Sequence, residues 1–155
     1  ARAQCYRGPI AYCIDGGAEL KIMNATIYTD GGARGNPGPA AIGVVIKDET
    51  GKNLAAYGEY IGVQTNNTAE YRAIISALEK ARALGATTVD CFLDSLLVVE
   101  QLNRQWKVKE PHLQKLFVLA WNAAAQFKKA TFRHIRREKN KEADAQVNKA
   151  LDKRR

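Results

Sequence analysis

Short apolar runs predict three strands in the first part of the chain. The run Ala25-Thr26-Ile27-Tyr28-Thr29-Asp30 is rich in Thr, Ile and Tyr, which favour a pleated, partly buried backbone. Residues 41–47 and 54–61 form two further runs, and Asp48-Glu49-Thr50-Gly51-Lys52 between them is typical of a hairpin turn. Because the connections are so short, the three strands are expected to pair as an antiparallel meander.

The pattern then changes to a helical period and alternates between helix and strand. Apolar residues across 68–84 recur in steps of three and four, which indicates one buried helix face, and Gly85 is typical of a helix end. The remaining elements are expected as a strand at 89–93, helices at 95–103 and 111–127, a strand at 130–136 and a helix from about residue 141. This order predicts one α/β domain, a mixed sheet with helices packed on its faces.

The domain is expected to span residues 23–155 and to end in a basic tail. Residues 1–22 differ from the rest, and Met23, the only methionine, is a natural first residue. The first 22 residues are therefore interpreted as added sequence or as an extra hairpin around Asp15-Gly16. No apolar run approaches the roughly 20 residues that span a bilayer, and the first residues lack the pattern of a secretory signal. We expect a cytoplasmic protein without a membrane partner.

Positive charge is concentrated at the end of the chain. The net charge is +8, and +7 of it lies in the last 28 residues, where eleven Lys and Arg accompany four acids. Such clustering favours a polyanionic partner, of which nucleic acid is the commonest, over a merely solvated tail. The three cysteines and two histidines form no metal-ligand pattern, so a zinc site is not expected, and Cys91 is interpreted as a core residue.

Asp30 is the first candidate catalytic residue, because dense turn chemistry follows it directly. The segment from Gly31 to Pro39 contains four Gly and two Pro in nine residues. A backbone with so few side chains suits a site where a bulky anion or a metal must approach a carboxylate. An ordinary hairpin with a solvated Asp at its mouth is the alternative.

Three further carboxylates occupy comparable positions, each with an ordinary structural alternative. Glu70 falls in the first turn of the long helix, where it also completes a capping box with Asn67. Asp94 follows the fourth strand and would lie beside Asp30 if the first and fourth strands were adjacent and parallel, although it also suits a helix N-cap. Asp144 falls in the first turn of the last helix, where an acid also favours the helix dipole.

Four carboxylates around one mouth would repel each other unless a cation were present. Oxygen ligands without His or Cys suit Mg²⁺ or Mn²⁺. Two such ions can activate a water and stabilise the leaving oxygen of a phosphodiester. In a basic protein this set predicts metal-dependent cleavage of nucleic acid rather than binding alone.

Four segments resemble, in order, the motifs of the type 1 ribonuclease H family. They are Tyr28 to Pro39, Thr65 to Glu70, Leu93 to Ser95 and Asn140 to Asp144, and the resemblance covers residues 23–153. It implies the ribonuclease H-like fold, a five-stranded mixed sheet whose first three strands are antiparallel and whose later strands are parallel, with helices on both faces. It also implies endonucleolytic cleavage of the RNA strand of RNA/DNA hybrids, leaving 5′-phosphate and 3′-hydroxyl ends.

Carried over residue by residue, the resemblance implies that Asp30, Glu70, Asp94 and Asp144 are catalytic and hold two Mg²⁺, with Mn²⁺ as a substitute. Glu70 would also sense a ribose 2′-hydroxyl, the group that separates RNA from DNA. The substrate-binding residues implied are Gly31 and Gly32, which would admit the RNA backbone, and Asn36, Thr65, Asn66, Asn67, Ser95, Trp106 and Arg137. No small-molecule cofactor is implied, and we expect a monomer.

The chain departs from the family pattern in three places. Residues 136–141 lack the His and Gly of a loop found in many bacterial members, so Arg137 or Lys139 is the candidate for assisting product release. The basic handle of some members is missing, which leaves Trp106 either as a remnant of the contact with the DNA strand or as a lid on the core. Leu96 stands where members often have a polar residue that contacts RNA.

Two other functions compete with this interpretation. A proofreading-type 3′–5′ exonuclease uses four carboxylates on a related sheet, but its Asp-x-Glu motif is not matched by Asp30-Gly31-Gly32. The alternative that is not an enzyme is a catalytically silent module that only binds RNA/DNA hybrids.

Overall fold

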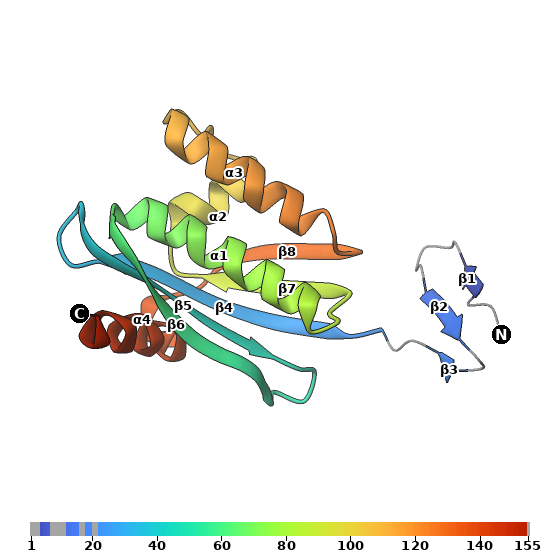
Figure 1. Ribbon diagram of the computed structural model, residues 1–155. Helices are drawn as coiled ribbons and strands as arrows, with labels where there is room; N and C mark the ends of the chain where they lie inside the picture. Colours follow the sequence, from blue (N-terminus) through green and yellow to red (C-terminus); the bar gives the residue numbers. More distant parts are fainter. Residues whose placement is uncertain (1–3, 7–11, 16–17, 20–21, 155) are drawn as a thin grey trace.

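The computed structural model describes residues 4–6, 12–15, 18–19 and 22–154 (Figure 1). Within the first 22 residues, β1 (Gln4–Tyr6), β2 (Tyr12–Asp15) and β3 (Ala18–Glu19) form a small antiparallel sheet. Asp15 pairs with Ala18, as expected for strands on either side of an Asp-Gly turn, although the turn itself lies outside the described residues. The division of the chain at Met23 stays a prediction.

The main sheet has five strands in the order β6-β5-β4-β7-β8. The strands are β4 (Asn24–Ala33), β5 (Gly38–Lys47), β6 (Asn53–Gln64), β7 (Thr88–Leu93) and β8 (Lys129–His134). The first three pair antiparallel, and β7 and β8 continue the sheet in parallel. This confirms the predicted mixed sheet, with β4 at the point where antiparallel and parallel pairing meet.

Four helices and one short 3₁₀ turn complete the domain, and Figure 1 shows helices on both sides of the sheet. They are α1 (Asn66–Ala83), α2 (Leu96–Leu102), α3 (Pro111–Ala124), η1 (Arg137–Lys139) and α4 (Lys141–Lys153). The predicted element order is confirmed. The basic residues after Lys128 lie in or beside β8, η1 and α4, so most of the predicted tail is part of the folded domain.

The larger core lies between the sheet and α1. Ile74, Leu78 and Ala81 recur at helical spacing and are fully buried against the β4 and β5 side chains, among them Ile27 and Val44. Burial of an Ile, Leu or Val side chain of this kind contributes about 1.5–3 kcal/mol. Cys91 is buried in the same cluster, as predicted. This core fixes α1, and with it Glu70, against the strand that carries Asp30.

On the opposite face, α4 lies directly against the backbone of β5 and β6. A Cβ atom at Gly43 or Gly58 would overlap the backbone carbonyls of Ala143 or Gln146. Glycine at these two positions therefore allows the close approach of α4. Because Ala143 precedes Asp144, this packing also sets the position of that carboxylate relative to the sheet.

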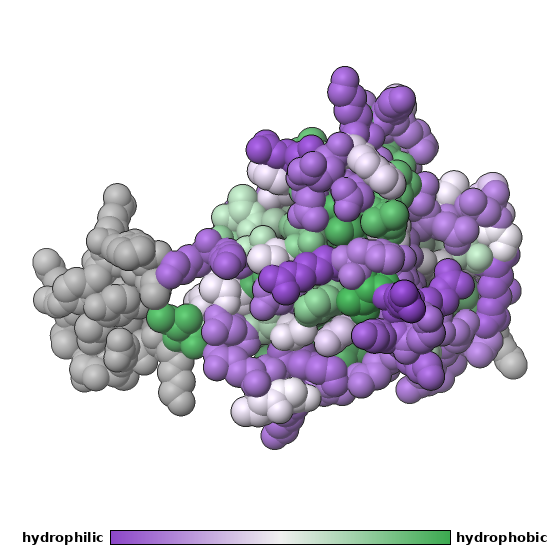
Figure 2. Space-filling model, turned by 180° about the vertical axis from the view of Figure 1, so that it is seen from behind, coloured by the Kyte–Doolittle hydropathy of each residue, from purple (hydrophilic) through white to green (hydrophobic). Residues whose placement is uncertain are grey.

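Polar side chains cover most of the face shown in Figure 2, and apolar ones gather close to α3. On α3 itself, Val118, Leu119 and Trp121 are the exposed large apolar residues. Among the described residues, no helix is both long enough and apolar enough to cross a bilayer.

Candidate active site

The sheet brings Asp30 and Asp94 together. The parallel pairing of β4 with β7 ends at Thr29 and Leu93, so the next residues, Asp30 and Asp94, are neighbours. The first and fourth predicted strands are thus adjacent and parallel, which is the condition under which Asp30 and Asp94 were expected to be neighbours. Asp30 does not end its strand, however, because Gly31, Gly32 and Ala33 continue β4 by pairing with β5.

Glu70 reaches the same place from α1, but not through the predicted capping box. The N-cap is Thr65, whose side chain accepts a hydrogen bond from the Thr68 backbone N at 3.2 Å. Asn67 is inside the helix, and Glu70 is its fifth residue. The capping prediction is therefore wrong, and the Glu70 carboxylate is free to face Asp30.

Gly31 allows this approach of α1 to β4. It is buried, and a Cβ atom there would overlap the Ala69 carbonyl and the Glu70 backbone N. Its missing side chain makes room for the helix. Gly31 also lines the cleft, and its role in admitting the RNA backbone stays a prediction. Gly32 remains open to the predicted role, since a Cβ there would meet only Val147 Cγ1 at 3.8 Å.

The carboxylates form a compact cluster. One oxygen from each of Asp30, Glu70 and Asp94 lies within 4.8 Å of the other two. Asp144, from the first turn of α4, completes the wall of the same cleft, which has a volume of about 380 Å³. Four segments that are far apart in sequence thus place their carboxylates around one mouth.

The cluster is electrostatically strained when it holds no cation. Burial, repulsion by Asp94 and a hydrogen bond with Asp144 raise the pKa of Asp30 from its ordinary 3.8 to about 7. Burial, with repulsion from Asp30 and Asp94, also raises the pKa of Glu70 well above its ordinary value. Both side chains are only 8 % exposed, so water does little to stabilise their charges.

The donor set fits divalent metal ions. Glu70 Oε2 and Asp94 Oδ2 are buried atoms without a hydrogen-bond partner among the described residues. A buried carboxylate oxygen without a partner costs free energy, which a bound cation would recover. Because all the candidate ligands are oxygen atoms, they suit Mg²⁺ or Mn²⁺ rather than zinc.

Most of the predicted substrate-binding residues lie at this cleft. Those that line it are Gly31, Gly32, Asn66, Asn67, Ser95 and Arg137. Asn36 and Thr65 act beside it: Asn36 Oδ1 accepts a hydrogen bond from the Asn66 backbone N at 3.0 Å, and Thr65 caps α1.

Trp106 lies elsewhere. It is 46 % exposed and lines a separate hollow with Arg104, Lys107 and Phe117, so it does not act as a lid on the core. Its contact with a DNA strand stays a prediction.

The comparisons with known proteins agree with this geometry. A family model described as reverse transcriptase-like matches residues 28–150. The solved ribonuclease H1 of the archaeon Halobacterium salinarum is 40 % identical, with a TM-score of 0.83 over 84 % of this chain and 99 % of that one. The N-terminal ribonuclease H domain of Rv2228c from Mycobacterium tuberculosis is 44 % identical, with a TM-score of 0.82 over 84 % and 94 % of the two chains.

The chain belongs to the ribonuclease H family.

Two relatives are longer than the segment that matches this chain. The bifunctional protein Rv2228c is 45 % identical over 131 residues, which are 84 % of this chain but 36 % of that protein. Ribonuclease HI of Halobacterium salinarum is 42 % identical over 125 residues, 81 % of this chain and 63 % of that one. The chain therefore spans between about a third and two thirds of these relatives.

In this chain, the two candidates for the missing loop His are separated. Arg137 lines the carboxylate cleft, whereas Lys139 lines a neighbouring hollow with Tyr28 and Lys47. His134 is exposed at the end of β8 and is not part of the cleft lining. Of these three residues, only Arg137 lines the carboxylate cleft.

The sequence interpretation missed three residues of the site. Arg34 and Asn148 line the cleft, and Asn140, which is almost fully buried, links the start of α4 to β4. Asn140 Nδ2 donates a hydrogen bond to the Thr29 backbone carbonyl at 2.8 Å, and the Asn140 backbone carbonyl accepts one from the Asp144 backbone N at 3.1 Å. Asn148 could have been found from its spacing, because it is four residues after Asp144 on the same helix face.

We expect Asn140→Ala to lower the stability of the protein by about 2 kcal/mol, because the buried Thr29 carbonyl loses its side-chain donor. We also expect kcat to fall with little change in KM, since Asn140 positions Asp144 relative to Asp30. Urea unfolding and steady-state kinetics measure the two effects. The exposed Asn148 makes only a 3.4 Å contact with Asp144, so Asn148→Ala should change stability by less than about 0.5 kcal/mol. Equal effects of the two substitutions on stability would refute the assignment.

The raised pKa of Asp30 predicts an unusual pH dependence. Between pH 3.8 and about 7 the folded protein keeps a proton that the unfolded chain loses, so the free energy of unfolding should fall as pH rises. The slope for one proton is at most about 1.4 kcal/mol per pH unit. Urea unfolding in EDTA across this range should show a steeper fall for the unmodified chain than for Asp30→Asn. Parallel profiles would contradict the prediction.

Proposed function

We propose that this ribonuclease H hydrolyses the RNA strand of RNA/DNA hybrids as an endonuclease, leaving 5′-phosphate and 3′-hydroxyl ends. The observation that carries the proposal is the carboxylate cluster, with its buried oxygens that lack partners, inside a protein of net charge +8. If the cluster had only a structural role, no cation would compensate the cost of burying these carboxylate oxygens. A neighbour solved in complex with an RNA/DNA hybrid, LC11-RNase H1, supports the substrate: it is 48 % identical, with a TM-score of 0.79 over 83 % of this chain and 97 % of that one.

In this proposal Asp30, Glu70, Asp94 and Asp144 hold two Mg²⁺ ions, which Mn²⁺ can replace. When bound, the ions supply an activated water and stabilise the charge that develops on the leaving oxygen. The protein supplies surroundings of low dielectric constant. Because Asp30 and Glu70 are buried, water screens their charges little, and these charges act strongly on groups in the cleft.

The remaining residues of the cleft bind and orient the hybrid. Glu70 also accepts a hydrogen bond from the ribose 2′-hydroxyl, and Asn66 and Asn67, on the first turn of α1, contact the minor groove. The Asn66 side chain is held in place, because its Oδ1 accepts a hydrogen bond from the Ala33 backbone N at 2.9 Å. Arg137 assists the departure of the cleaved strand. The exposed basic residues of β8, η1 and α4 attract the polyanion over a longer range.

Incubation of the protein with an end-labelled RNA/DNA hybrid in Mg²⁺, Mn²⁺ or EDTA tests the proposal. We expect internal cuts in the RNA strand with either metal and none in EDTA, and products that a 5′-phosphate-specific exonuclease can degrade. Stepwise shortening from the 3′ end would indicate the exonuclease alternative, and binding without cleavage would indicate the silent module. The monomeric state and the cytoplasmic location are further proposals, which sedimentation and fractionation would test.

A further inference from the structure

Arg34 is one of the two cationic residues that line the cleft. It follows β4 directly, and its backbone N donates a hydrogen bond to the Pro39 carbonyl at 2.8 Å, which closes the turn between β4 and β5. Among the described residues that line the cleft, only Arg34 and Arg137 carry a positive charge. Arg137 lies in η1, in a different segment, so the two guanidinium groups come to the carboxylates from separate elements.

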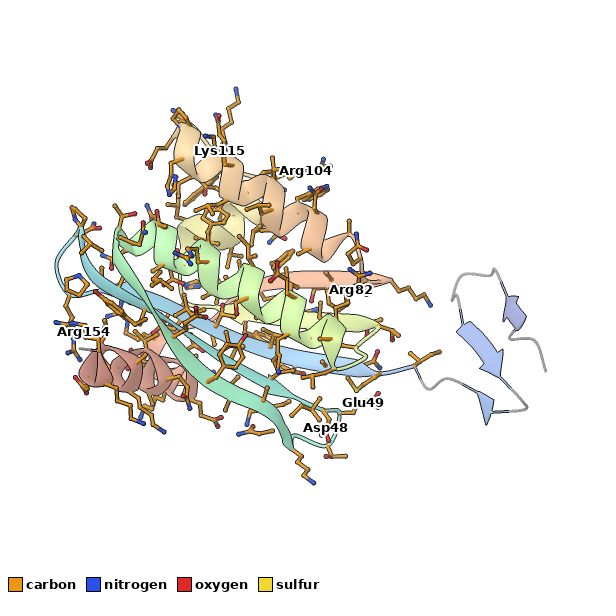
Figure 3. The ribbon with its side chains drawn as sticks, viewed as in Figure 1. Asp48, Glu49, Arg82, Arg104, Lys115 and Arg154 are labelled. Atoms are coloured by element: carbon orange, nitrogen blue, oxygen red, sulfur yellow. The ribbon has the colours of Figure 1, made fainter. Side chains whose placement is uncertain are left out.

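Arg34 is held by an acid at the end of α4. Its Nη2 lies 2.8 Å from Asp152 Oδ1, and the two side chains are 44 % and 66 % exposed. Figure 3 shows this end of α4, marked by Arg154, beside the turn between β4 and β5. Asp152 is in the last turn of α4, where the helix dipole disfavours an acid. The Arg34 guanidinium offsets this unfavourable interaction with the helix dipole.

The ion pair between Arg34 and Asp152 is weak enough for another anion to replace the Asp152 carboxylate. Pairs between exposed side chains contribute about 0–1 kcal/mol, because water screens both charges. A phosphodiester can replace the carboxylate, since it offers two oxygens to the planar guanidinium. Asp152 would lose little on release, because most of its side chain already faces water.

We propose that Arg34 binds a backbone phosphate of the hybrid and that Asp152 competes for the same guanidinium, so that the ion pair lowers the affinity for the hybrid. This inference rests on the proposed function. It makes Asp152 a residue that tunes affinity from outside the carboxylate cluster. A purely structural pair, which only fastens the turn to α4, is the alternative.

Hybrid binding by a set of variants tests the inference. All of them carry Asp30→Asn to prevent cleavage, and the dissociation constant of a fluorescent RNA/DNA hybrid is measured by anisotropy in Mg²⁺ at several salt concentrations. Arg34→Gln should weaken binding about fivefold to tenfold and reduce the slope of log K against log salt by about 1, as expected for the loss of one phosphate contact. Asp152→Asn should tighten binding about twofold to threefold, within the range expected for an exposed pair.

Two controls separate competition from a general charge effect. Glu142→Gln removes one acid from the same helix, where Glu142 pairs with Lys47 at 3.2 Å outside the cleft, and it should leave binding close to that of the parent. In the Arg34→Gln background, Asp152→Asn should lose its effect. Unchanged binding by Arg34→Gln, or the same gain from Asp152→Asn with and without Arg34, would overturn the inference. If the inference fails but the unmodified chain cleaves the hybrid, the proposed function is still supported. If the unmodified chain neither binds nor cleaves it, both fail.

Discussion

Asp30→Asn is expected to abolish cleavage and, in the same protein, to raise stability. Loss of one metal ligand should remove about 4 kcal/mol of transition-state stabilisation, a decrease of about a thousandfold in kcat. Without metal at pH 8, the amide removes a buried charge that Asp94 and Glu70 repel, so the midpoint of thermal unfolding should increase. Kinetics with a labelled hybrid and calorimetry in EDTA measure the two effects.

Asp48→Asn is the matched control. Asp48 lies in the β5–β6 hairpin, at the other end of the sheet from Arg154 (Figure 3). Its pKa is lowered by hydrogen bonds from Thr50 and Lys52, so the charged form is the favoured one. This substitution should leave cleavage unchanged and reduce stability at pH 8. Asp30→Asn with activity within tenfold of the unmodified chain, or with lower stability in EDTA, would sink the site assignment.

Gly31→Ala is expected to have the second largest effect. The new methyl group would overlap the Ala69 carbonyl and the Glu70 backbone N, so the first turns of α1 must move away from β4. Overpacking of this kind costs about 1–3 kcal/mol. Because displacement of a reacting group by about 1 Å can cost a hundredfold, kcat should also fall by about that factor. Unfolding midpoints and kcat of the variant measure both.

Gly32→Ala provides the comparison one residue away. Its methyl group would meet Val147 at an ordinary distance, so stability should change by less than about 0.5 kcal/mol. If Gly32 admits the RNA backbone, as predicted, KM should rise while the unfolding midpoint stays the same. Similar losses of stability at both positions would show that the approach of α1 does not depend on Gly31.

The order of the elements and the four carboxylates could be predicted from the sequence, because both leave local signals. An acid after a short apolar run, an acid near the start of a helix and the change from short apolar runs to a helical period can all be recognised from neighbouring residues. The adjacency of β4 and β7 was only a condition in the sequence analysis, and the structure shows that it is met. These local patterns still describe the elements of the folded protein, because they follow from the backbone geometry of a helix or a strand.

The misassigned and missed residues depend on contacts between distant segments. Thr65 and Asn67 are equally good caps in sequence, and only the start of α1 distinguishes them. The role of Gly31 depends on a helix that begins 35 residues later. Asn140 looked like a polar residue before a helix, but the packing of α4 against β4 buries it. Arg34 left a weak signal, as the one cation within a Gly- and Pro-rich turn.

Cleavage of the RNA strand alone, in a hybrid with a DNA strand, can be measured directly. A hybrid whose RNA and DNA strands carry different dyes is incubated with the protein in Mg²⁺, and both strands are followed on one denaturing gel, with Asp94→Asn as the inactive control. For a ribonuclease H activity we expect internal cuts in the RNA strand, an intact DNA strand and no cleavage by the variant. Cleavage of the DNA strand, or an uncut hybrid in both Mg²⁺ and Mn²⁺, would contradict it.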